Sequence, residues 1–244
     1  MPEGPSIIIA KEKLEVFVGK KIITASGSAG IDLKRLEGKK IVRMTTWGKH
    51  LLFCFDDFTV RIHFLMFGTY FINSSKQLRP KLRLSFARGK ELNIYTSAIQ
   101  LFEGPPEEYY DLSADIMNDK WSAASARKKL KAIPDAMIVD SLADQEIFSG
   151  CGNIIKNEVL FRARIHPESK TGLIPPKSLN LLVREVRRYA FQFLQWKKAY
   201  TLSAHWEVYT KKKCPRDGTE ITKSYPGKTR RRAYCCNTCQ VKYD

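Results

Sequence analysis

The chain opens with two residues whose types could do chemistry, Pro2 and Glu3, directly behind Met1. Pro2 is small enough for Met1 to be removed by ordinary cellular processing, which would leave a secondary amine at the terminus with a carboxylate beside it. The alternative interpretation is an exposed, frayed start followed by a helix that begins with proline. These first residues do not decide between the two.

Near the other end of the chain, four of the six cysteines fall within the last 31 residues. This uneven placement indicates a metal site rather than a disulfide framework. Cys236 and Cys239 have the spacing of one zinc knuckle, and Cys214 with Asp217 stands where its partner pair should be. Because aspartate is a legitimate zinc ligand, we expect one structural zinc ion held by three Cys and one Asp.

Two alternatives to this ligand set stay open. Cys235 is a second candidate for the fourth position, although adjacent residues in a strand point to opposite faces. A finger that has lost its metal is the other alternative.

The segment SGCGNIIKNEVLF places Gly150 and Gly152 around Cys151, immediately before a helical pattern that Asn153 begins. Backbone N–H groups and the positive end of a helix dipole make such a turn a ready anion site. Asn153 could add a side-chain donor to the same phosphate. The alternative is an ordinary helix start with glycines for a tight turn.

Between the cysteines, TKSYPGKTRRRAY is typical of a β-hairpin tipped by Pro226 and Gly227 and loaded with Arg230, Arg231 and Arg232. A hairpin fixed at its base by a metal would hold guanidinium groups rigidly against a phosphate backbone. A solvated charge run is the weaker alternative.

Two further segments of the first half carry candidate residues. WGKHLLF places Lys49 at the mouth of an apolar strand run, where a lysine is usually a surface residue. RIHFLMFGTY ends a strand with Leu65, Met66 and Phe67 before a glycine. Packing is the default explanation for these three, but apolar side chains beside a turn could also form a wedge pushed into a base stack.

The elements that must position these residues differ along the chain. A helix over 7–18 should precede short strands separated by turn residues, which predicts a β-sandwich domain over 1–112. The strand-like segments are 20–26, 39–47, 50–55, 59–64, 81–86 and 91–95.

A linker rich in proline and acid leads into a second domain, over 113–204, in which the apolar period becomes helical. The segments that suit helices are 122–132, 135–148, 152–165 and 176–196. In the last of these, an apolar stripe is most simply core and consists of Leu179, Leu182, Val183, Val186, Tyr189 or Ala190, and Phe193. The cysteine-bearing hairpin over 205–244 completes an α+β chain.

The overall composition indicates what kind of partner the protein binds. Among 244 residues, 42 Lys and Arg stand against 25 Asp and Glu, a net charge of +17 that indicates a polyanion, chiefly nucleic acid. An anionic membrane competes, but no apolar run approaches the roughly 20 residues that span a bilayer. We expect a monomer in the cytoplasm, nucleoid-associated if bacterial, with reduced thiols.

Taken in order, PEGP, WGKHLL, HFLMFG, GCGNIIKNEVLFRARIHP and a finger ending CxxCQ resemble the formamidopyrimidine-DNA glycosylase / endonuclease VIII family of base-excision repair enzymes. The resemblance covers nearly the whole chain. It implies a β-sandwich domain, a helix–two-turn–helix domain, a zinc-finger hairpin, and double-stranded DNA containing oxidised bases or abasic sites as the partner.

The same resemblance gives the first residues a role. It implies that the Pro2 amine attacks C1′ of a damaged nucleotide and displaces the base, which is covalent catalysis by an amine. Glu3 would donate and accept protons during ring opening and elimination, which breaks the strand on both sides of the sugar. Lys49 matches the lysine that touches the lesion phosphates.

The implied DNA contacts lie in both halves. Asn153 matches the phosphate-binding turn residue, and Arg231 matches the arginine near the finger tip, with its register uncertain by one. The candidates around them are Arg230, Lys156, and the wedge residues Leu65, Met66 and Phe67, which would fill the space left by an everted nucleotide.

The sequence favours the endonuclease VIII branch. Where the purine-directed branch carries an arginine that addresses the orphaned base, this chain reads TSAIQLF, with Gln100 and Leu101 as the expected DNA contacts at that place. The stretch between the last long helix and the finger is also short for a loop covering an everted 8-oxoguanine. Oxidised pyrimidines are therefore the expected substrate, with a purine-directed enzyme as the alternative.

Two residues depart from the family pattern, Asp217 for a cysteine and Ile155 for a tyrosine. A protein that binds damaged DNA without chemistry is the rival to the enzyme, and a zinc-bearing RNA-binding or ribosome-associated protein is a third reading. Salt-sensitive affinity for DNA would not separate the first two.

Overall fold

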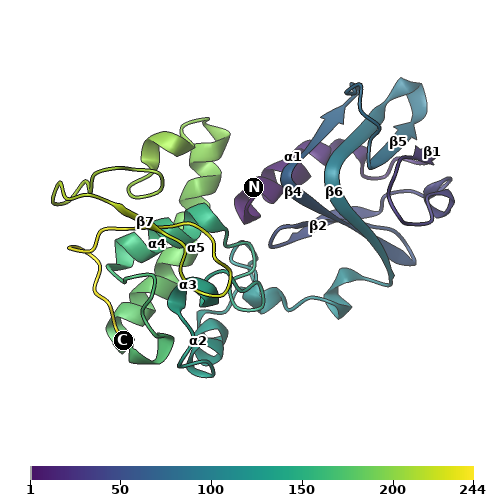
Figure 1. Cartoon of the computed structure of the whole chain (residues 1–244). Helices are drawn as coiled ribbons and strands as arrows, with labels where there is room; N and C mark the ends of the chain where they lie inside the picture. The colour runs from purple at the N-terminus through teal and green to yellow at the C-terminus, as the bar shows by residue number, and fades with distance from the viewer. Residues whose placement is uncertain (1) are drawn as a thin grey trace. The chain divides into compact units, whose positions relative to one another are not determined.

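The computed structural model describes residues 2–244, and the chain forms two compact units, the first ending at Tyr110 and the second spanning Asp111–Asp244 (Figure 1). The division falls within two residues of the predicted limit at 112. Residues 205–244 lie in the second unit together with the helices.

The first unit contains one antiparallel sheet of six strands in the order β1-β5-β6-β4-β3-β2. Four of the strands are short, and β4 and β6 are long. Their bounds are β1 Ile22–Ser26, β2 Arg43–Trp47, β3 His50–Cys54, β4 Phe58–Ile72, β5 Leu82–Phe86 and β6 Glu91–Glu103.

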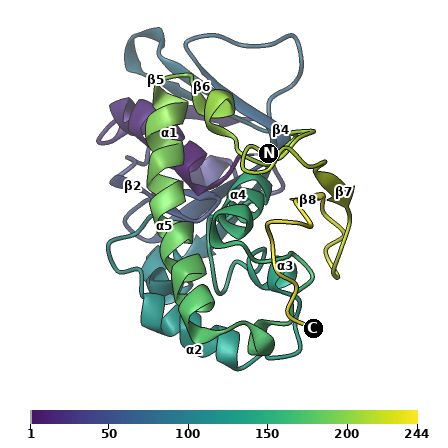
Figure 2. The same ribbon diagram turned by 90° about the vertical axis from the view of Figure 1, so that its left-hand side faces the viewer.

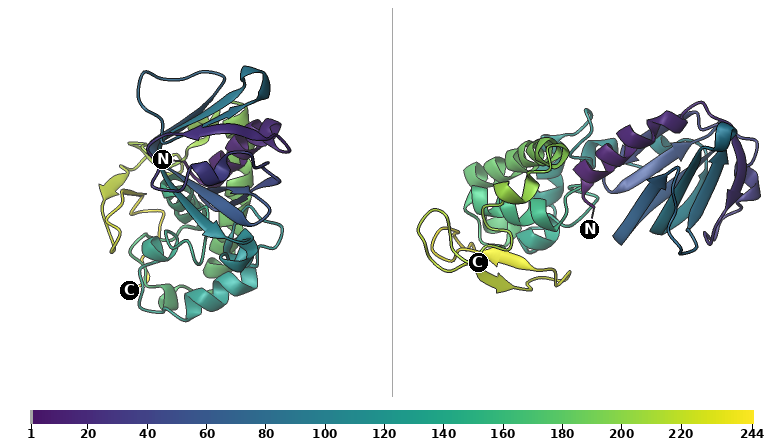
Figure 3. Two further views of the ribbon diagram at one scale, coloured as in Figure 1. Left: turned by 90° about the vertical axis from the view of Figure 1, so that its right-hand side faces the viewer. Right: turned by 90° about the horizontal axis from the view of Figure 1, so that it is seen from above.

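The two long strands turn this sheet into a sandwich. The first half of β4 pairs with β3, whereas its second half pairs with the start of β6, which continues to β5 and β1. Apolar side chains from both halves belong to one buried cluster, so the sheet encloses a common core. Figure 3 shows the ribbons of these strands with the N-terminal helix beside them. The predicted β-sandwich is confirmed, but β4 and β6 continue well beyond the predicted segments 59–64 and 91–95.

Helix α1, Gly4–Leu14, packs on this sheet. It begins three residues earlier than predicted because Pro5 fits the first helical turn, where an N–H has no partner in any case. Ile7, Ala10 and Leu14 recur at helical spacing and are buried in the core of the sheet. A single 3₁₀ turn follows, and its Phe17 stacks on Phe86 of β5 at a centroid distance of 4.5 Å.

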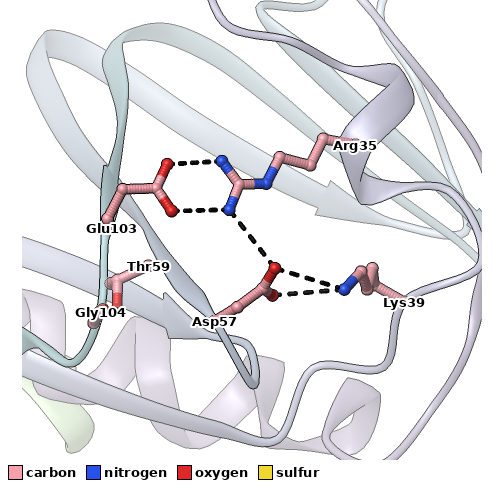
Figure 4. Close-up of polar contacts among 6 residues, drawn as sticks. All are labelled: Arg35, Lys39, Asp57, Thr59, Glu103 and Gly104. Atoms are coloured by element: carbon pink, nitrogen blue, oxygen red, sulfur yellow. Dashed lines mark hydrogen bonds and ion pairs between the residues drawn. The ribbon is translucent and has the colours of Figure 1, made fainter.

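Charged side chains tie the ends of the long strands to a neighbouring loop (Figure 4). Arg35 donates two hydrogen bonds to Glu103 at 2.6 and 2.7 Å, and Asp57 accepts from both Arg35 and Lys39. The Arg35 guanidinium also lies 4.4 Å from the ring of Phe58. This network fastens the start of β4 and the end of β6 over the edge of the core.

The second unit is helical, with α2 Ala123–Lys131, α3 Ile138–Ser141, α4 Asn153–Ala163 and α5 Pro176–Lys198. Figure 2 shows α5 running the length of this unit beside α4. The predicted apolar stripe of α5 is confirmed, since every member is buried. Across the described residues, no helix combines the length and apolarity needed to cross a membrane.

The helix predicted over 135–148 is wrong for most of its length, because only α3 forms there. Asp144 uses its carboxylate to accept the N–H of Glu146 two residues later. Such a local side-chain hydrogen bond competes with the helical ladder and favours turns.

The predicted β-hairpin is formed by β7, Thr222–Ser224, and β8, Ala233–Cys235. It packs on a small apolar cluster that includes Val208, Ile221 and Tyr234, together with Phe161 from α4. The side chain of Gln240 donates to the carbonyl of Ile165 at 2.8 Å. The hairpin is therefore part of the helical unit rather than an appendage.

Glu158 of α4 is fully buried and organises the chain that leads into the hairpin. Its carboxylate accepts three backbone N–H groups, those of Glu207, Val208 and Tyr209, at 2.8–3.2 Å. Burial raises the pKa of Glu158, and the three backbone donors act in the opposite direction. A buried carboxylate is tolerated here because its oxygens are satisfied.

We expect Glu158→Ala to destabilise the second unit by about 3 kcal/mol, because three buried N–H groups lose their acceptor. Hydrogen–deuterium exchange should accelerate at amides 207–209, and urea should unfold the unit earlier. The exposed Glu146→Ala is the matched control. Unchanged protection of these amides would show that Glu158 does not hold this segment.

Candidate functional site

Pro2 and Glu3 lie directly in front of α1. Glu3 is extended (φ −116°, ψ 169°), and its carbonyl accepts the N–H groups of Ser6 at 2.7 Å and Ile7 at 3.3 Å. Glu3 is only 2% exposed and lies at the N-cap position of α1. The helix start thus fixes the backbone beside Pro2, whereas the expected removal of Met1 lies outside the described residues.

Lys49 occupies a turn rather than the strand position expected for it. With Gly48 it forms the two-residue connection between β2 and β3, and Trp47 pairs with His50 across it. Gly48 has φ 53°, a conformation that tight hairpin turns require. Lys49 is 8% exposed, so the hairpin holds it in a largely buried position.

Sequence reasoning missed a group of cationic and imidazole side chains near Lys49. His50 of β3 pairs with His63 of β4, their rings lie 5.1 Å apart, and Arg61 is two residues away on β4. The signal was present, because Arg61 and His63 alternate with core residues and must share the face opposite the core. The positive charges of Lys49 and Arg61 favour an anion at this face.

Burial lowers the pKa of His50 to about 3, and Arg61, His63 and Lys49 add to the effect. Burial also lowers the pKa of His63. The rings of Trp47 and Tyr110 lie 5.5 and 5.7 Å from the His50 ring and help to exclude water from it. Both imidazoles are therefore neutral at neutral pH.

These shifts predict loss of stability on acidification. Unfolded His50 takes up a proton near pH 6.5 and folded His50 does not until about pH 3, so stability falls as pH falls through that window. Between pH 6.5 and 4.5 we expect His50→Gln to lose about 2 kcal/mol less of its unfolding free energy than the wild type. Urea unfolding at both pH values measures this; equal losses would contradict it.

The wedge residues lie in an interruption of the β4–β6 ladder. The strands pair up to Phe64 and again from Thr69, and only Thr96 of β6 lies opposite the four residues between. A Cβ on Gly68 would lie 2.7 Å from the Thr96 carbonyl oxygen, so the close approach requires glycine. The bulge is thereby fixed in position.

Leu65, Met66 and Phe67 are 44%, 65% and 79% exposed. Large apolar side chains in consecutive positions are seldom left in water unless they contact something else. The packing alternative is therefore not supported for these three, and their position on a rigid bulge suits insertion into a base stack.

Gln100 and Leu101 are not grouped with the wedge. They lie in the regular part of the β6 ladder, opposite Arg61 and Val60. Gln100 is four residues from Thr96, about 13 Å along a strand. Leu101 packs against the core of the first unit, so its expected role as a DNA contact is not supported by its position.

Asn153 is the first residue of α4, behind Gly152 at the N-cap position. Its side-chain oxygen is buried and accepts no hydrogen bond from the described residues. Lys156 corrects our expectation of a DNA contact, because it is only 1% exposed and donates to the carbonyl of Arg232 at 3.4 Å. Lys156 supports the hairpin from within the unit.

The three arginines of the hairpin are all exposed but differ in their surroundings. The Arg232 guanidinium donates hydrogen bonds to the hydroxyl oxygens of Tyr234 and Tyr225, which raise its pKa and engage it within the hairpin. Arg230 has a left-handed backbone (φ 45°). Arg230 and Arg231 are therefore the better candidates for a phosphate contact.

Four side chains converge at the base of the hairpin and could hold a metal ion. One donor atom from each of Cys214, Asp217, Cys236 and Cys239 lies within 4.8 Å of the others. The sulfurs of Cys214 and Cys239 are 3.7 Å apart, and one Asp217 oxygen lies 3.4 Å from the Cys236 sulfur.

These distances fit a tetrahedral site. With metal–sulfur bonds of about 2.3 Å, two sulfurs of a tetrahedron lie about 3.8 Å apart, and a sulfur and an oxygen about 3.5 Å. The second Asp217 oxygen accepts from the N–H and hydroxyl of Thr219, which turns the first oxygen toward the sulfurs. The Cys239 thiol donates to an Asp217 oxygen at 2.9 Å, and this hydrogen bond, together with burial and the neighbouring thiols, raises the pKa of Cys239 to about 12.

Cys235 does not belong to the cluster. It is buried in β8, paired with Thr222, and burial raises the pKa of its thiol to about 12. The alternation of side chains along the strand sends it to the face opposite Cys236.

The purified protein should contain one equivalent of a thiolate-binding divalent ion per chain. Cys236→Ser should lose that ion, because a hydroxyl replaces one of four ligands, whereas the adjacent Cys235→Ser should keep it. Mass spectrometry of the metal content measures both. Metal loss from Cys235→Ser with retention by Cys236→Ser would overturn the ligand set.

The geometry agrees with comparisons to known proteins. Residues 1–97 match the formamidopyrimidine-DNA glycosylase N-terminal domain, and residues 112–199 match the formamidopyrimidine-DNA glycosylase H2TH domain. Endonuclease 8-like 3 of Xenopus laevis is 30% identical over an alignment of 238 residues, which covers 90% of this chain and 38% of that protein. The formamidopyrimidine-DNA glycosylase of Halalkalibacterium halodurans is 29% identical over an alignment of 276 positions, which covers 98% of this chain and all of that one.

A solved structure of Lactococcus lactis formamidopyrimidine-DNA glycosylase, non-covalently bound to DNA containing an AP site, aligns with a TM-score of 0.87 at 25% identity. The alignment covers 98% of this chain and all of the other. A viral DNA glycosylase, at 20% identity and a TM-score of 0.85, shares the fold. The chain spans about two fifths of the length of the endonuclease 8-like 3 relatives.

Two family domains in the expected order, a fold that aligns over almost the whole chain and a cysteine cluster at the base of a hairpin all agree. This chain belongs to the formamidopyrimidine-DNA glycosylase / endonuclease VIII family, and its sequence is consistent with the endonuclease VIII-like branch.

Proposed function

We propose that the protein is a bifunctional DNA glycosylase and AP lyase that excises oxidised bases through the amine of Pro2. The observation that carries this proposal is the start of α1, which holds Glu3 buried beside Pro2 and fixes the backbone there. A nucleophile and a proton-transfer group on adjacent residues of a rigid helix start meet the geometric demand of covalent catalysis.

In the first stage, the nitrogen of Pro2 attacks C1′ of the lesion nucleotide and the glycosidic bond breaks. The bonding electron pair leaves with the base, which takes up a proton. Glu3 protonates the ring oxygen as the sugar opens, leaving an iminium between C1′ and the Pro2 nitrogen. Because proline is a secondary amine, this iminium is cationic without an added proton.

The iminium draws electrons from C2′, and loss of a C2′ proton lets the C3′–O bond break with its phosphate. A second proton loss, from C4′, expels the phosphate on the other side. Water then hydrolyses the iminium and restores the amine. The strand is thus cut on both sides of the sugar by β,δ-elimination.

The remaining residues would hold the DNA. Lys49 and Arg61, which both lie close to the neutral His63, supply positive charge for phosphates in the first unit. Asn153 and Arg231 serve phosphates in the second. Leu65, Met66 and Phe67 fill the stack after the damaged nucleotide is everted, a step that costs a few kcal/mol.

Oxidised pyrimidines are the proposed substrates. The absence of arginine from TSAIQLF and the identity to endonuclease 8-like relatives support this choice. A purine-directed enzyme is the alternative, supported by the alignment with Lactococcus lactis formamidopyrimidine-DNA glycosylase. Excision from duplexes carrying either an oxidised pyrimidine or 8-oxoguanine distinguishes the two.

The four-residue cluster of the hairpin is proposed to bind zinc, since thiolate and carboxylate in a tetrahedron suit that ion. Zinc would crosslink the hairpin base and take no part in the chemistry. The enzyme is proposed to act as a monomer on double-stranded DNA, in the cytoplasm or at the nucleoid.

Borohydride trapping tests the proposal, because it reduces the iminium to a stable protein–DNA adduct. We expect an adduct with abasic duplex DNA, reduced but measurable with Pro2→Gly, whose primary amine forms a neutral imine unless protonated. Glu3→Gln should slow base excision at least about 100-fold, with binding largely kept. The exposed Glu12→Gln on α1 is the control.

No adduct from protein whose mass confirms an unblocked Pro2 would leave the rival, a damaged-DNA-binding protein without chemistry. Full wild-type rates in Pro2→Gly would place the nucleophile elsewhere. Equal loss of binding and excision in Glu3→Gln would assign Glu3 a structural role.

A further inference from the structure

The tip of the β7–β8 hairpin carries three consecutive exposed arginines and a lysine, and these cations repel one another. A loop with this charge would ordinarily be mobile, and ordering it on a polyanion would cost conformational entropy. In this structure, side chains from two helices of the same unit hold the loop on both sides of the arginine run.

On the leading side of the arginine run, Asp140 of α3 places its carboxylate inside the bend. One oxygen accepts the N–H of Lys228 at 2.8 Å, and the other accepts the N–H of Thr229 at 3.1 Å. The sequence separation is 88 and 89 residues, so this contact is purely tertiary. A carboxylate that accepts successive backbone N–H groups forms strong, charge-assisted hydrogen bonds.

Gly227 makes this contact sterically possible. Its φ is 74°, and a Cβ at this position would lie 2.4 Å from an oxygen of Asp140. No other residue type would allow the carboxylate so close to the bend. The glycine and the aspartate therefore form a matched pair.

On the trailing side, Asn157 of α4 holds the strand that follows the arginines. Its side-chain nitrogen donates to the carbonyl of Arg232 at 3.2 Å, and its oxygen accepts the N–H of Tyr234 at 2.7 Å. Asn157 is 1% exposed, and Lys156 beside it donates to the same Arg232 carbonyl at 3.4 Å. The trailing side is thus fixed to the inside of the unit.

We propose that Asp140 is a positioning residue for DNA binding, which together with Asn157 pre-organises the arginine run before any DNA arrives. This inference rests on the proposed function, because it assumes that the arginines contact phosphates. Asp140 itself touches no DNA in this proposal. It acts through the backbone of residues 228 and 229 on Arg230 and Arg231.

The proposal predicts an effect opposite in sign to simple electrostatics. Removing a carboxylate from a protein that binds a polyanion ordinarily strengthens binding. Asp140→Ala should instead weaken it, because the freed loop must be ordered on the DNA. The exposed Asp135→Ala, from the same loop region, reports the electrostatic effect alone.

The experiment measures Kd for duplex DNA with a stable abasic analogue, for the full chain with its metal content verified. We expect Asp140→Ala to weaken binding about 10-fold relative to Asp135→Ala, and Asp140→Asn, which keeps one acceptor oxygen, to weaken it less. The borohydride-trapping rate at saturating DNA should stay within about twofold of the wild type.

A double-mutant cycle on Kd distinguishes positioning of the arginines by Asp140 from a purely structural role. In the Arg230→Ala/Arg231→Ala background, Asp140→Ala should have little further effect on Kd, because the groups it positions are gone. An equal loss in both backgrounds would overturn the proposal. So would an Asp140→Ala variant that binds as tightly as Asp135→Ala.

DNA binding by the wild type distinguishes a failure of the proposed function from a failure of the proposal for Asp140. If it does not bind the abasic duplex, the proposed function fails, and the proposed role of Asp140 in DNA binding fails with it. If it binds, and Asp140→Ala binds equally well while hydrogen–deuterium exchange shows amides 228 and 229 still protected, Asp140 is not the clamp.

Discussion

The second unit depends on hydrogen bonds that buried side chains of α4 make to backbone groups later in the chain. Glu158 fixes the segment at 207–209, and Asn157 and Lys156 fix the strand at 232–234. Because each donor or acceptor is buried, leaving its partner unpaired would cost more than the bond itself contributes. One helix therefore determines where a long, polar and strongly basic stretch of chain can lie.

This arrangement explains how a basic hairpin can be rigid. Its arginines repel one another and have little apolar surface to bury, so local interactions cannot order them. Groups outside the loop hold it in place instead. They are the candidate metal-binding cluster at the base, the Asp140 carboxylate at the tip and the Asn157 amide at the trailing strand. The cluster, the clamp and the apolar contact with Phe161 act on different parts of the same loop.

In the first unit, apolar packing has the role that buried hydrogen bonds have in the second. Two long strands bury apolar side chains around one core and can tolerate an interruption of their ladder at residues 65–68. The interruption presents apolar side chains to solvent, which weakens the isolated unit and is useful only if another molecule covers them. The first turn of α1 buries Gly4, Pro5 and Ile7, and the N–H groups of Ser6 and Ile7 in the same turn donate to the Glu3 carbonyl.

Much of this protein was determined by sequence alone. The composition indicated a polyanion partner, the apolar period gave α5 and its buried stripe, and cysteine spacing identified three of the four cluster residues and suggested Asp217 as the fourth. These features are local, since the residues that form a helix stripe or a zinc knuckle lie within a few positions of one another in the sequence. The ordered motifs then indicated the family.

Only the tertiary structure decided the rest. It moved Lys49 into a turn, extended β4 and β6, and reduced the segment at 135–148 to one short helix. It also buried Lys156, which we had expected to contact DNA. It also brought Asp140 against a loop 88 residues away. Such outcomes depend on which residues, far apart in the sequence, are buried next to one another. No local sequence pattern shows which hydrogen-bond donor will pair with which distant acceptor.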